Sequence, residues 1–132
     1  MKVGLVSCCG PKLDRPAPAQ DLYTSDLFKK SRAYVEATCD RWAILSAKHG
    51  LVMPNQVLEP YDVRLGAMPA TERRVWALTT HTQLRAAFGP DAKFVVLAGK
   101  RYLAATEGLK VVTPLAGKGI GERLSWLKSK VR

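Results

Sequence analysis

The fold is decided by KVGLVS at residues 2–7, an apolar run that leads directly into a polar loop. Three later runs share this pattern, at residues 42–47, 93–98 and 109–113. Continuous rather than alternating apolar runs are typical of strands that are buried on both faces. Segments long enough for helices separate them, as parallel neighbours require. We therefore predict a three-layer α/β/α sandwich with a mainly parallel four-stranded sheet.

Three helices are predicted between and after these strands. The first opens at Ser25, an N-cap residue, and buries Leu27, Phe28, Tyr34 and Val35. The second begins near Pro69 and runs to Phe88, before Gly89 and Pro90 end it. The third starts at about Gly121 and turns one face to the core, formed by Ile120, Leu124, Leu127 and Val131. Its cations stabilise the helix end or contact a ligand: Arg123, Lys128, Lys130 and Arg132.

Length and charge limit the class of protein. The 132 residues, 47% of them hydrophobic, suit one domain over residues 1–132. Against 11 acidic residues stand 21 basic ones, so the formal net charge is +10. Such a charge favours a polyanionic partner, nucleic acid or a nucleotide, over a surface whose cations only keep the protein soluble.

Cysteine usage and hydropathy indicate a cytoplasmic protein. No apolar run approaches the roughly 18 residues that span a bilayer, so we expect no membrane segment and no secretory signal. Cys8, Cys9 and Cys39 are an odd number and contain no C-x-x-C motif, which argues against disulfides and zinc. We expect no metal and no cofactor, and the oligomeric state stays open.

The loops that follow the four apolar runs are rich in glycine and cations. They are residues 7–12, 46–50, 99–102 and 114–121. In an open parallel sheet these loops meet at the carboxyl ends of the strands, where ligands bind. Glycine lets backbone amides approach a phosphate, and Lys and Arg neutralise it. Gly119 and Gly121 fit neither the dinucleotide fingerprint nor a phosphate loop, which excludes those two classes.

Candidate catalytic groups are Asp62, Lys48 and His49. Lys48 and His49 follow an apolar run, and Asp62 lies in an irregular stretch, residues 49–68, that can fold back over them. A carboxylate there orients water, while the cations stabilise a leaving group. The alternative is that Asp62 caps a turn and His49 is a surface histidine. Cys8 offers a third chemistry, as the nucleophile of a thiol-dependent hydrolase, unless it is buried and inert.

Several motifs together resemble a small family of mostly uncharacterised bacterial and phage proteins. The motifs are Ser7-Cys8 with Lys12, Leu22-Tyr23-Thr24-Ser25 with Phe28, Leu45-Ser46-Ala47 with Gly50-Leu51, and Pro60-Tyr61-Asp62. Gly99 with Tyr102, and Gly119 to Arg123, extend the resemblance over nearly the whole chain. The first two motifs are also similar to YaaA-type peroxide-stress proteins, which implies a uracil-DNA-glycosylase-like fold. Cys9 stands where that pattern has serine.

The resemblance implies an enzyme that processes a base in nucleic acid or a nucleotide, with DNA favoured and DNA repair as a role. Such an enzyme cleaves or exchanges an N-glycosidic bond, with Asp62 stabilising the sugar cation or activating water and Lys48 assisting. Tyr23 or Tyr61 stacks the base and Ser25 bonds to it, although tyrosines are equally often core residues. The alternative is a DNA- or RNA-binding module without catalysis. The predicted ligand-binding residues are Ser7, Cys8, Lys12, Tyr23, Ser25, Tyr61, Gly99, Tyr102, Gly119, Gly121 and Arg123.

Overall fold

The central strand of the fold is β1 (Lys2–Ser7), as KVGLVS predicts. The computed structural model describes residues 1–7 and 10–130. On one side β1 pairs in parallel with β3 (Arg41–Ser46), and on the other with β6 (Lys93–Leu97). Residues 3–7 of β1 are all buried, because layers cover both faces of the sheet. The predicted parallel centre of the sheet is therefore confirmed.

The edges of the sheet correct the predicted number of strands. At one edge β7 (Lys110–Val112) runs parallel to β6, as predicted. At the other edge β4 (Gly50–Val52) pairs antiparallel with β3, so within the described residues the sheet has five strands, in the order β4-β3-β1-β6-β7. β4 is too short to stand out as an apolar run. It exists because Gly50, with φ +73°, turns the chain tightly back along β3.

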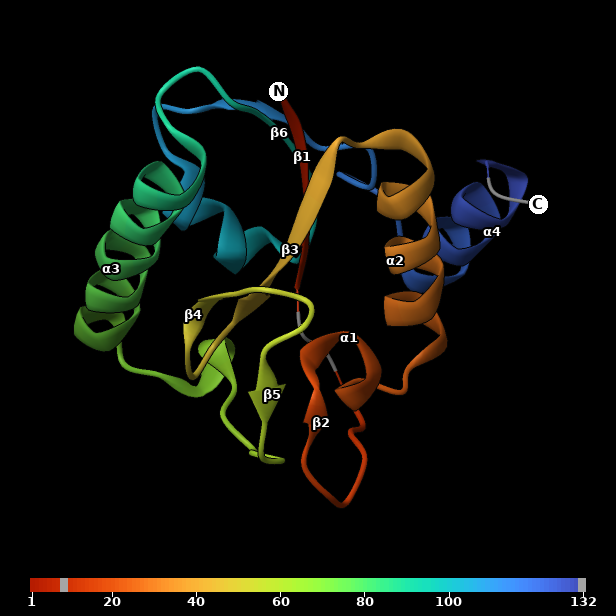
Figure 1. The fold of residues 1–132 in the computed structure, drawn as a ribbon, viewed down its shortest axis with the longest axis horizontal. Coiled ribbons are helices and arrows are strands. Elements are labelled where there is room, and N and C mark those ends of the chain that lie inside the picture. The colour runs from red at the N-terminus through yellow and green to blue at the C-terminus, as the bar shows by residue number, and fades with distance from the viewer. Residues whose placement is uncertain (8–9, 131–132) are drawn as a thin grey trace.

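Helical segments cover the two faces of the sheet (Figure 1). On one side lie α2 (Asp26–Thr38) and α4 (Ile120–Lys130), which pack against each other. On the opposite side α3 (Ala70–Phe88) packs against β4 and the 3₁₀ helix η2 (Lys100–Thr106). The chain is thus a mixed α/β protein with the sheet between two helical layers.

The predicted starts and ends of the helices follow from local chemistry. The Ser25 hydroxyl caps α2 by accepting a hydrogen bond of 3.1 Å from the Phe28 amide. Pro69 directly precedes α3, and Gly89, with φ +80°, ends it. In α2, Phe28 and Val35 are fully buried, while Leu27 and Tyr34 are partly buried.

The core face predicted for the last helix is wrong at its first position. Ile120 is 65% exposed, whereas Leu127 is buried and Trp126 packs against the core. Trp126 also stacks on Tyr34 with ring centroids 5.1 Å apart, which anchors α4 to α2. Val131 and Arg132 lie outside the described residues.

The irregular stretch folds into short elements at the carboxyl end of the sheet. After β4 it forms β5 (Val57–Leu58) and the 3₁₀ helix η1 (Leu65–Ala67). β5 pairs antiparallel with β2 (Ala17–Pro18), which leads into the short helix α1 (Ala19–Leu22). Figure 1 shows β2, α1 and β5 beyond the end of β1 that lies opposite the N-terminus. In the part of the chain that the structure describes, no helix is both long and apolar enough to cross a bilayer.

Candidate functional site

The loops after β1 and β6 leave the sheet toward opposite faces. After β1 the chain continues to α2, and after β6 it enters η2, which packs against α3 on the other face. Because β1 and β6 are neighbours, their diverging loops open a crevice at the carboxyl ends of the two strands. This topological switch point is where open α/β sheets bind ligands.

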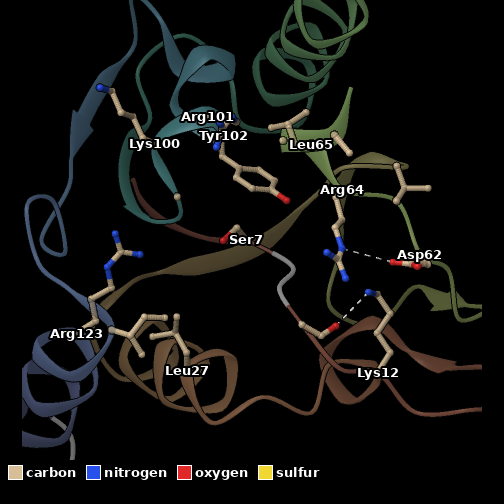
Figure 2. Close-up of a pocket in the computed structure, with 16 residues that line it drawn as sticks. Ser7, Lys12, Leu27, Asp62, Arg64, Leu65, Lys100, Arg101, Tyr102 and Arg123 are labelled. Carbon is tan, nitrogen blue, oxygen red and sulfur yellow. Dashed lines mark hydrogen bonds and ion pairs between the residues drawn. The ribbon is translucent and has the colours of Figure 1, made fainter. Parts of the chain in front are cut away.

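A cavity of about 730 Å³ lies at this switch point. We call it the basic cavity (Figure 2). Ser7 at the end of β1 and Gly10 just after it line one part of the cavity, and Gly99 and Tyr102, which follow β6, line another. Residues 62–67, Leu27 of α2 and the start of α4 line the cavity as well. Figure 2 shows the Tyr102 side chain reaching into the middle of the cavity from η2.

The charge of the basic cavity is strongly positive. Among its described lining residues, one carries a negative charge, Asp62, and five carry a positive charge: Lys12, Arg64, Lys100, Arg101 and Arg123. These cations come from four separate segments of the chain. Cations gathered around a hollow raise the local concentration of anions, and their fields add where low-dielectric walls surround them. The cavity is therefore suited to a phosphate-bearing ligand.

Contacts with the backbone hold some of these cations in place. Arg123 Nε donates a hydrogen bond of 2.9 Å to the Lys118 carbonyl, just before α4. Lys12 Nζ donates a hydrogen bond of 3.3 Å to the Gly10 carbonyl. Arg101 lies flat against η1, since a Cβ built on Gly66 would be only 3.5 Å from its Nη1 atom. Arginine and lysine held in this way still have N–H donors free to bind an anion.

Asp62 lies at the rim of the cavity. Its side chain is 89% exposed, and Oδ1 lies 3.8 Å from Arg64 Nε. Figure 2 shows the Asp62 and Lys12 side chains close to Arg64, on the side of the cavity opposite Arg123. An ion pair as exposed as this one contributes little to stability. The Asp62 carboxylate is therefore accessible to solvent and to a ligand.

A chain of buried hydroxyls lies behind Lys12. The Tyr61 hydroxyl is 2.7 Å from Ser46 Oγ and 2.5 Å from the Tyr23 hydroxyl. Lys12 Nζ stands over the Tyr61 ring, 4.7 Å from its centroid. Tyr23 is only 1% exposed, which leaves no face of its ring open for a base. The structure thus places Tyr23 in the core, where the sequence predicts a stacking residue.

Lys48 and His49 also lie beside Tyr61, with Lys48 Nζ 5.9 Å from the centroid of its ring. They line a second hollow of about 450 Å³, together with Trp76 and Thr80 of α3, which we call the His49 cavity. The ring centroids of His49 and Tyr61 are 5.3 Å apart. Burial, followed by the charge of Lys48, lowers the pKa of His49 from its ordinary value. The structure therefore divides the predicted catalytic set, because Asp62 lines the basic cavity whereas Lys48 and His49 line the other.

The remaining predicted ligand residues differ in their placement. Ser25 does not line the basic cavity, and its hydroxyl serves as the cap of α2. The Gly119 amide donates a 3.3 Å hydrogen bond to Glu122 Oε1, and this contact closes the first turn of α4. Gly121 is exposed in that turn and outside the cavity lining. Cys8 lies outside the described residues.

Arg64 is a lining cation that the sequence pattern does not predict. It stands in the irregular stretch, follows no apolar strand and belongs to no motif. Its spacing of two residues from Asp62 was the available signal, since alternate residues of an extended segment project to the same side. Lys100 and Arg101 follow an apolar strand, in one of the glycine- and cation-rich segments expected to bind an anion, although Gly99 and Tyr102 are the residues predicted to bind there.

Comparisons with known proteins agree with a small uncharacterised family. The model of a family of unknown function, DUF6884, matches residues 3–129. The uncharacterized protein YfjM of Bacillus subtilis (strain 168) is 31% identical over 128 residues, covering 88% of this chain and 81% of that protein. No solved structure matches the chain significantly. Since the family match spans nearly the whole chain, the protein belongs to DUF6884, a family of unknown function.

Proposed function

We propose that the protein binds a nucleotide unit, free or within nucleic acid, in the basic cavity and cleaves or exchanges its N-glycosidic bond. One observation carries the proposal: cations from four chain segments line a single cavity at the switch point of the sheet, with one accessible carboxylate at its rim. A nucleotide supplies an anion for the cations and a base for the cavity, whose volume suits a ligand of that size.

The proposed roles follow from the positions of the side chains. Arg123 and Lys12, on opposite sides of the cavity in Figure 2, hold the phosphate and the sugar end of the ligand. Tyr102 offers its ring to the base, because it is only partly buried and reaches into the cavity. Its ring is held by an edge contact with Trp76, with centroids 5.4 Å apart. A base inside a duplex must be extruded to reach such a cavity.

Asp62 supplies the chemistry in this proposal. As the C–N bond breaks, positive charge develops on the sugar, and a carboxylate beside it stabilises that charge or accepts a proton from attacking water. The glycosidic step rests on the sequence resemblance to YaaA-type proteins, which implies a uracil-DNA-glycosylase-like fold. Lys48 and His49 have no direct role here, because they line the other hollow.

A binding module without catalysis is the second candidate. The observation that favours it is the 89% exposure of the Asp62 side chain and its pairing with Arg64. Water screens an exposed, paired carboxylate, whereas catalytic carboxylates are usually placed where burial strengthens their field. In this alternative Asp62 weakens anion binding and does nothing else.

Mass spectrometry of released bases tests the proposal. The protein is incubated with DNA, RNA and nucleotides that carry normal, deaminated and oxidised bases. We expect release by the wild type and by Asp91→Asn, a control carboxylate exposed in the loop between α3 and β6. Asp62→Asn should abolish release while binding the ligand at least as tightly, because a negative charge has been removed.

The other outcomes decide between the two candidates. No release from any substrate, together with binding that Arg123→Ala weakens, would favour the binding module. Binding that is unaffected by Arg123→Ala and by Lys12→Ala would overturn both, because each depends on the basic cavity.

A further inference from the structure

A second cationic hollow adjoins the basic cavity. It has a volume of about 670 Å³ and lies between α3 and η2, and we call it the α3 groove. Its cations are Arg73 and Arg74 of α3 with Lys100 and Arg101 of η2, and Glu107 lines it as well. The remaining lining residues are small or apolar: Ala70, Ala77, Leu78 and Ala104.

The two hollows share a wall. Lys100 and Arg101 line both the basic cavity and the α3 groove, so η2 separates the hollows and its cations serve each of them. A ligand that fills the basic cavity can therefore continue past Lys100 and Arg101 without leaving positively charged surface. Arg101 is also the residue that lies against Gly66 of η1, which places it where the two hollows meet.

The α3 side of the groove is one face of the helix. Residues 70, 73, 74, 77 and 78 follow the spacing of three and four that puts side chains on the same side of an α-helix. Arg73 is partly tied down, since Nη1 donates a 2.6 Å hydrogen bond to the Met68 carbonyl. Arg74 is exposed, and no ion pair is found for it within the described residues. Ala70 and Ala77 flank the two arginines with small side chains, and the Leu78 side chain adds an apolar surface that is 64% exposed.

We propose that the ligand is a single-stranded nucleic acid segment that runs from the basic cavity over η2 into the α3 groove. This inference rests on the proposed function, because the nucleotide in the basic cavity is one unit of that strand. A free nucleotide carries its phosphates in one place and cannot fill two hollows of this size at once. A single strand carries a phosphate at every unit, and its sugars and bases can contact the small and apolar residues between the cations.

A single strand fits better than a duplex because each hollow has a volume of about 670–730 Å³, which is the size of a small-ligand site. Each volume suits one small-molecule ligand, whereas a duplex would meet only the rims. Chemistry on a base also requires it to be unstacked, which a single strand allows at the lowest cost. Cationic grooves that follow the backbone, with aromatic side chains beneath the bases, are the common design of sites that bind single strands.

Fluorescence anisotropy with labelled oligothymidylate and oligouridylate, each about ten nucleotides long, tests this inference. Unlabelled thymidine monophosphate and uridine monophosphate serve as competitors that reach the basic cavity alone. Arg74→Ala removes the groove cation, Arg74→Lys retains its charge, and Arg85→Ala removes another exposed arginine of α3 that lies outside both hollows. Circular dichroism checks that each variant is folded.

We expect Arg74→Ala to weaken oligonucleotide binding several-fold and to leave competition by the mononucleotides unchanged. The slope of log affinity against log salt should fall by about 0.7 for the phosphate contact that is lost. Arg74→Lys should restore most of the binding, and Arg85→Ala should match the wild type. Arg123→Ala should weaken both the oligonucleotides and the mononucleotides. A difference between the affinities for oligothymidylate and oligouridylate shows whether the preferred strand is DNA or RNA.

Different failures point to different causes. If Arg74→Ala behaves like Arg85→Ala while Arg123→Ala weakens both ligands, the extended strand is overturned and the basic cavity stands. If neither Arg123→Ala nor Lys12→Ala changes the binding of either ligand, the proposed function fails, and the strand that depends on it fails as well. Tighter binding of a duplex of the same length would overturn the single-stranded form, and equal binding of an acidic peptide would overturn nucleic acid as the partner.

Discussion

The Tyr61 hydroxyl lies 2.7 Å from the Ser46 hydroxyl, and this contact ties the irregular stretch to the last residue of β3. Ser46 Oγ also accepts hydrogen bonds from the amides of Lys48 and His49, at 3.2 and 3.1 Å. These two amides occupy both of its lone pairs, so the Ser46 proton is donated to Tyr61. The Tyr61 hydroxyl also shares a hydrogen bond with the Tyr23 hydroxyl. Tyr61 thus links the irregular stretch both to the end of β3 and to the Tyr23 hydroxyl.

Tyr61→Phe should lower the free energy of unfolding by about 1–3 kcal/mol, because it removes the two hydrogen bonds that join the Tyr61 hydroxyl to Ser46 and to Tyr23. Ser46 is fully buried and Tyr23 nearly so, so water cannot replace the lost bonds. Tyr34→Phe is the matched control, since the Tyr34 hydroxyl has no hydrogen-bond partner within the described residues. Urea unfolding of the two variants measures the difference. Equal stability of both would show that the hydroxyl chain contributes nothing.

The sequence predicts the frame of the fold because its signals are local. KVGLVS and the later apolar runs mark the parallel strands, and Ser25, Pro69 and Gly89 mark the ends of helices through capping and backbone preference. β4 escapes prediction because its three residues have no periodicity of their own and depend on a tight turn. The prediction that Ile120 is a core residue is wrong because helical spacing shows which residues share a face of the helix, but not how much of that face packs against the core. Ile120 lines the basic cavity instead.

The candidate site is less predictable, because it depends on how distant segments pack. Glycine and cations after the strands indicated an anion site at the carboxyl edge, and Ser7, Lys12, Gly99, Tyr102 and Arg123 do line one cavity there. No local signal shows that Lys48 and His49 line a different cavity from Asp62, since the placement of these segments depends on long-range contacts such as that of Tyr61 with Ser46. The burial of Tyr23 likewise follows from its tertiary surroundings, which the sequence pattern does not contain.

Gly50→Ala should destabilise the protein more than Gly108→Ala. Both glycines have left-handed backbone, with φ of +73° and +79°, so alanine costs about 1–2 kcal/mol at either position. At Gly108 the new Cβ meets no atom within 4 Å, whereas at Gly50 it collides with Gln83 Oε1 and lies 3.0 Å from Thr80 Oγ1. Gln83 cannot simply move, because Oε1 accepts a 2.9 Å hydrogen bond from the Leu51 amide.

Loss of that hydrogen bond adds a further cost of about 1–3 kcal/mol at Gly50. Thermal unfolding of the two variants side by side measures the excess, because the backbone strain cancels in the comparison. If the two variants melt together, Gln83 yields freely and its bond to the start of β4 is unimportant.

Gly4→Ala and Gly121→Ala should shift stability in opposite directions. A Cβ on Gly4 would lie 2.5 Å from Val35 Cβ, an atom fixed to the backbone of α2, so the whole helix must move away from β1. We expect a loss of about 1–3 kcal/mol from this overpacking. Gly121 lies in α4 with nothing near its Cβ position, and alanine there should add about 0.5–1 kcal/mol through helix propensity.

Gly121→Ala also tests the predicted ligand role of that glycine. Because Gly121 lies outside the lining of the basic cavity, the variant should bind nucleotides like the wild type while unfolding at a higher denaturant concentration. Weaker binding would mean that a ligand approaches the backbone of α4 more closely than the cavity indicates.

His49 should make the protein less stable in mild acid. Burial and the neighbouring Lys48 charge lower the pKa of His49 in the folded state, from an ordinary value of 6.5 in the unfolded chain. The unfolded state then binds more protons than the folded state at the same pH, so the free energy of unfolding falls as the pH drops below 6.5. The protein has its full stability above that pH, and it loses stability as the pH falls from there to the lowered pKa of His49. This pH dependence disappears in His49→Gln, because glutamine cannot be protonated.

Urea unfolding between neutral pH and mild acid measures this effect as a slope against pH. The slope should be smaller for His49→Gln than for the wild type. His81→Gln is the control, because His81 lies on α3 with Nδ1 3.1 Å from the Ala105 carbonyl, away from Lys48. It removes the other histidine and should leave the part due to His49 in place. A slope for His49→Gln equal to that of the wild type would show that the folded protein accepts a proton at His49 as easily as the unfolded chain does. In that case His49 would be open to water, and the His49 cavity would not exclude solvent from it.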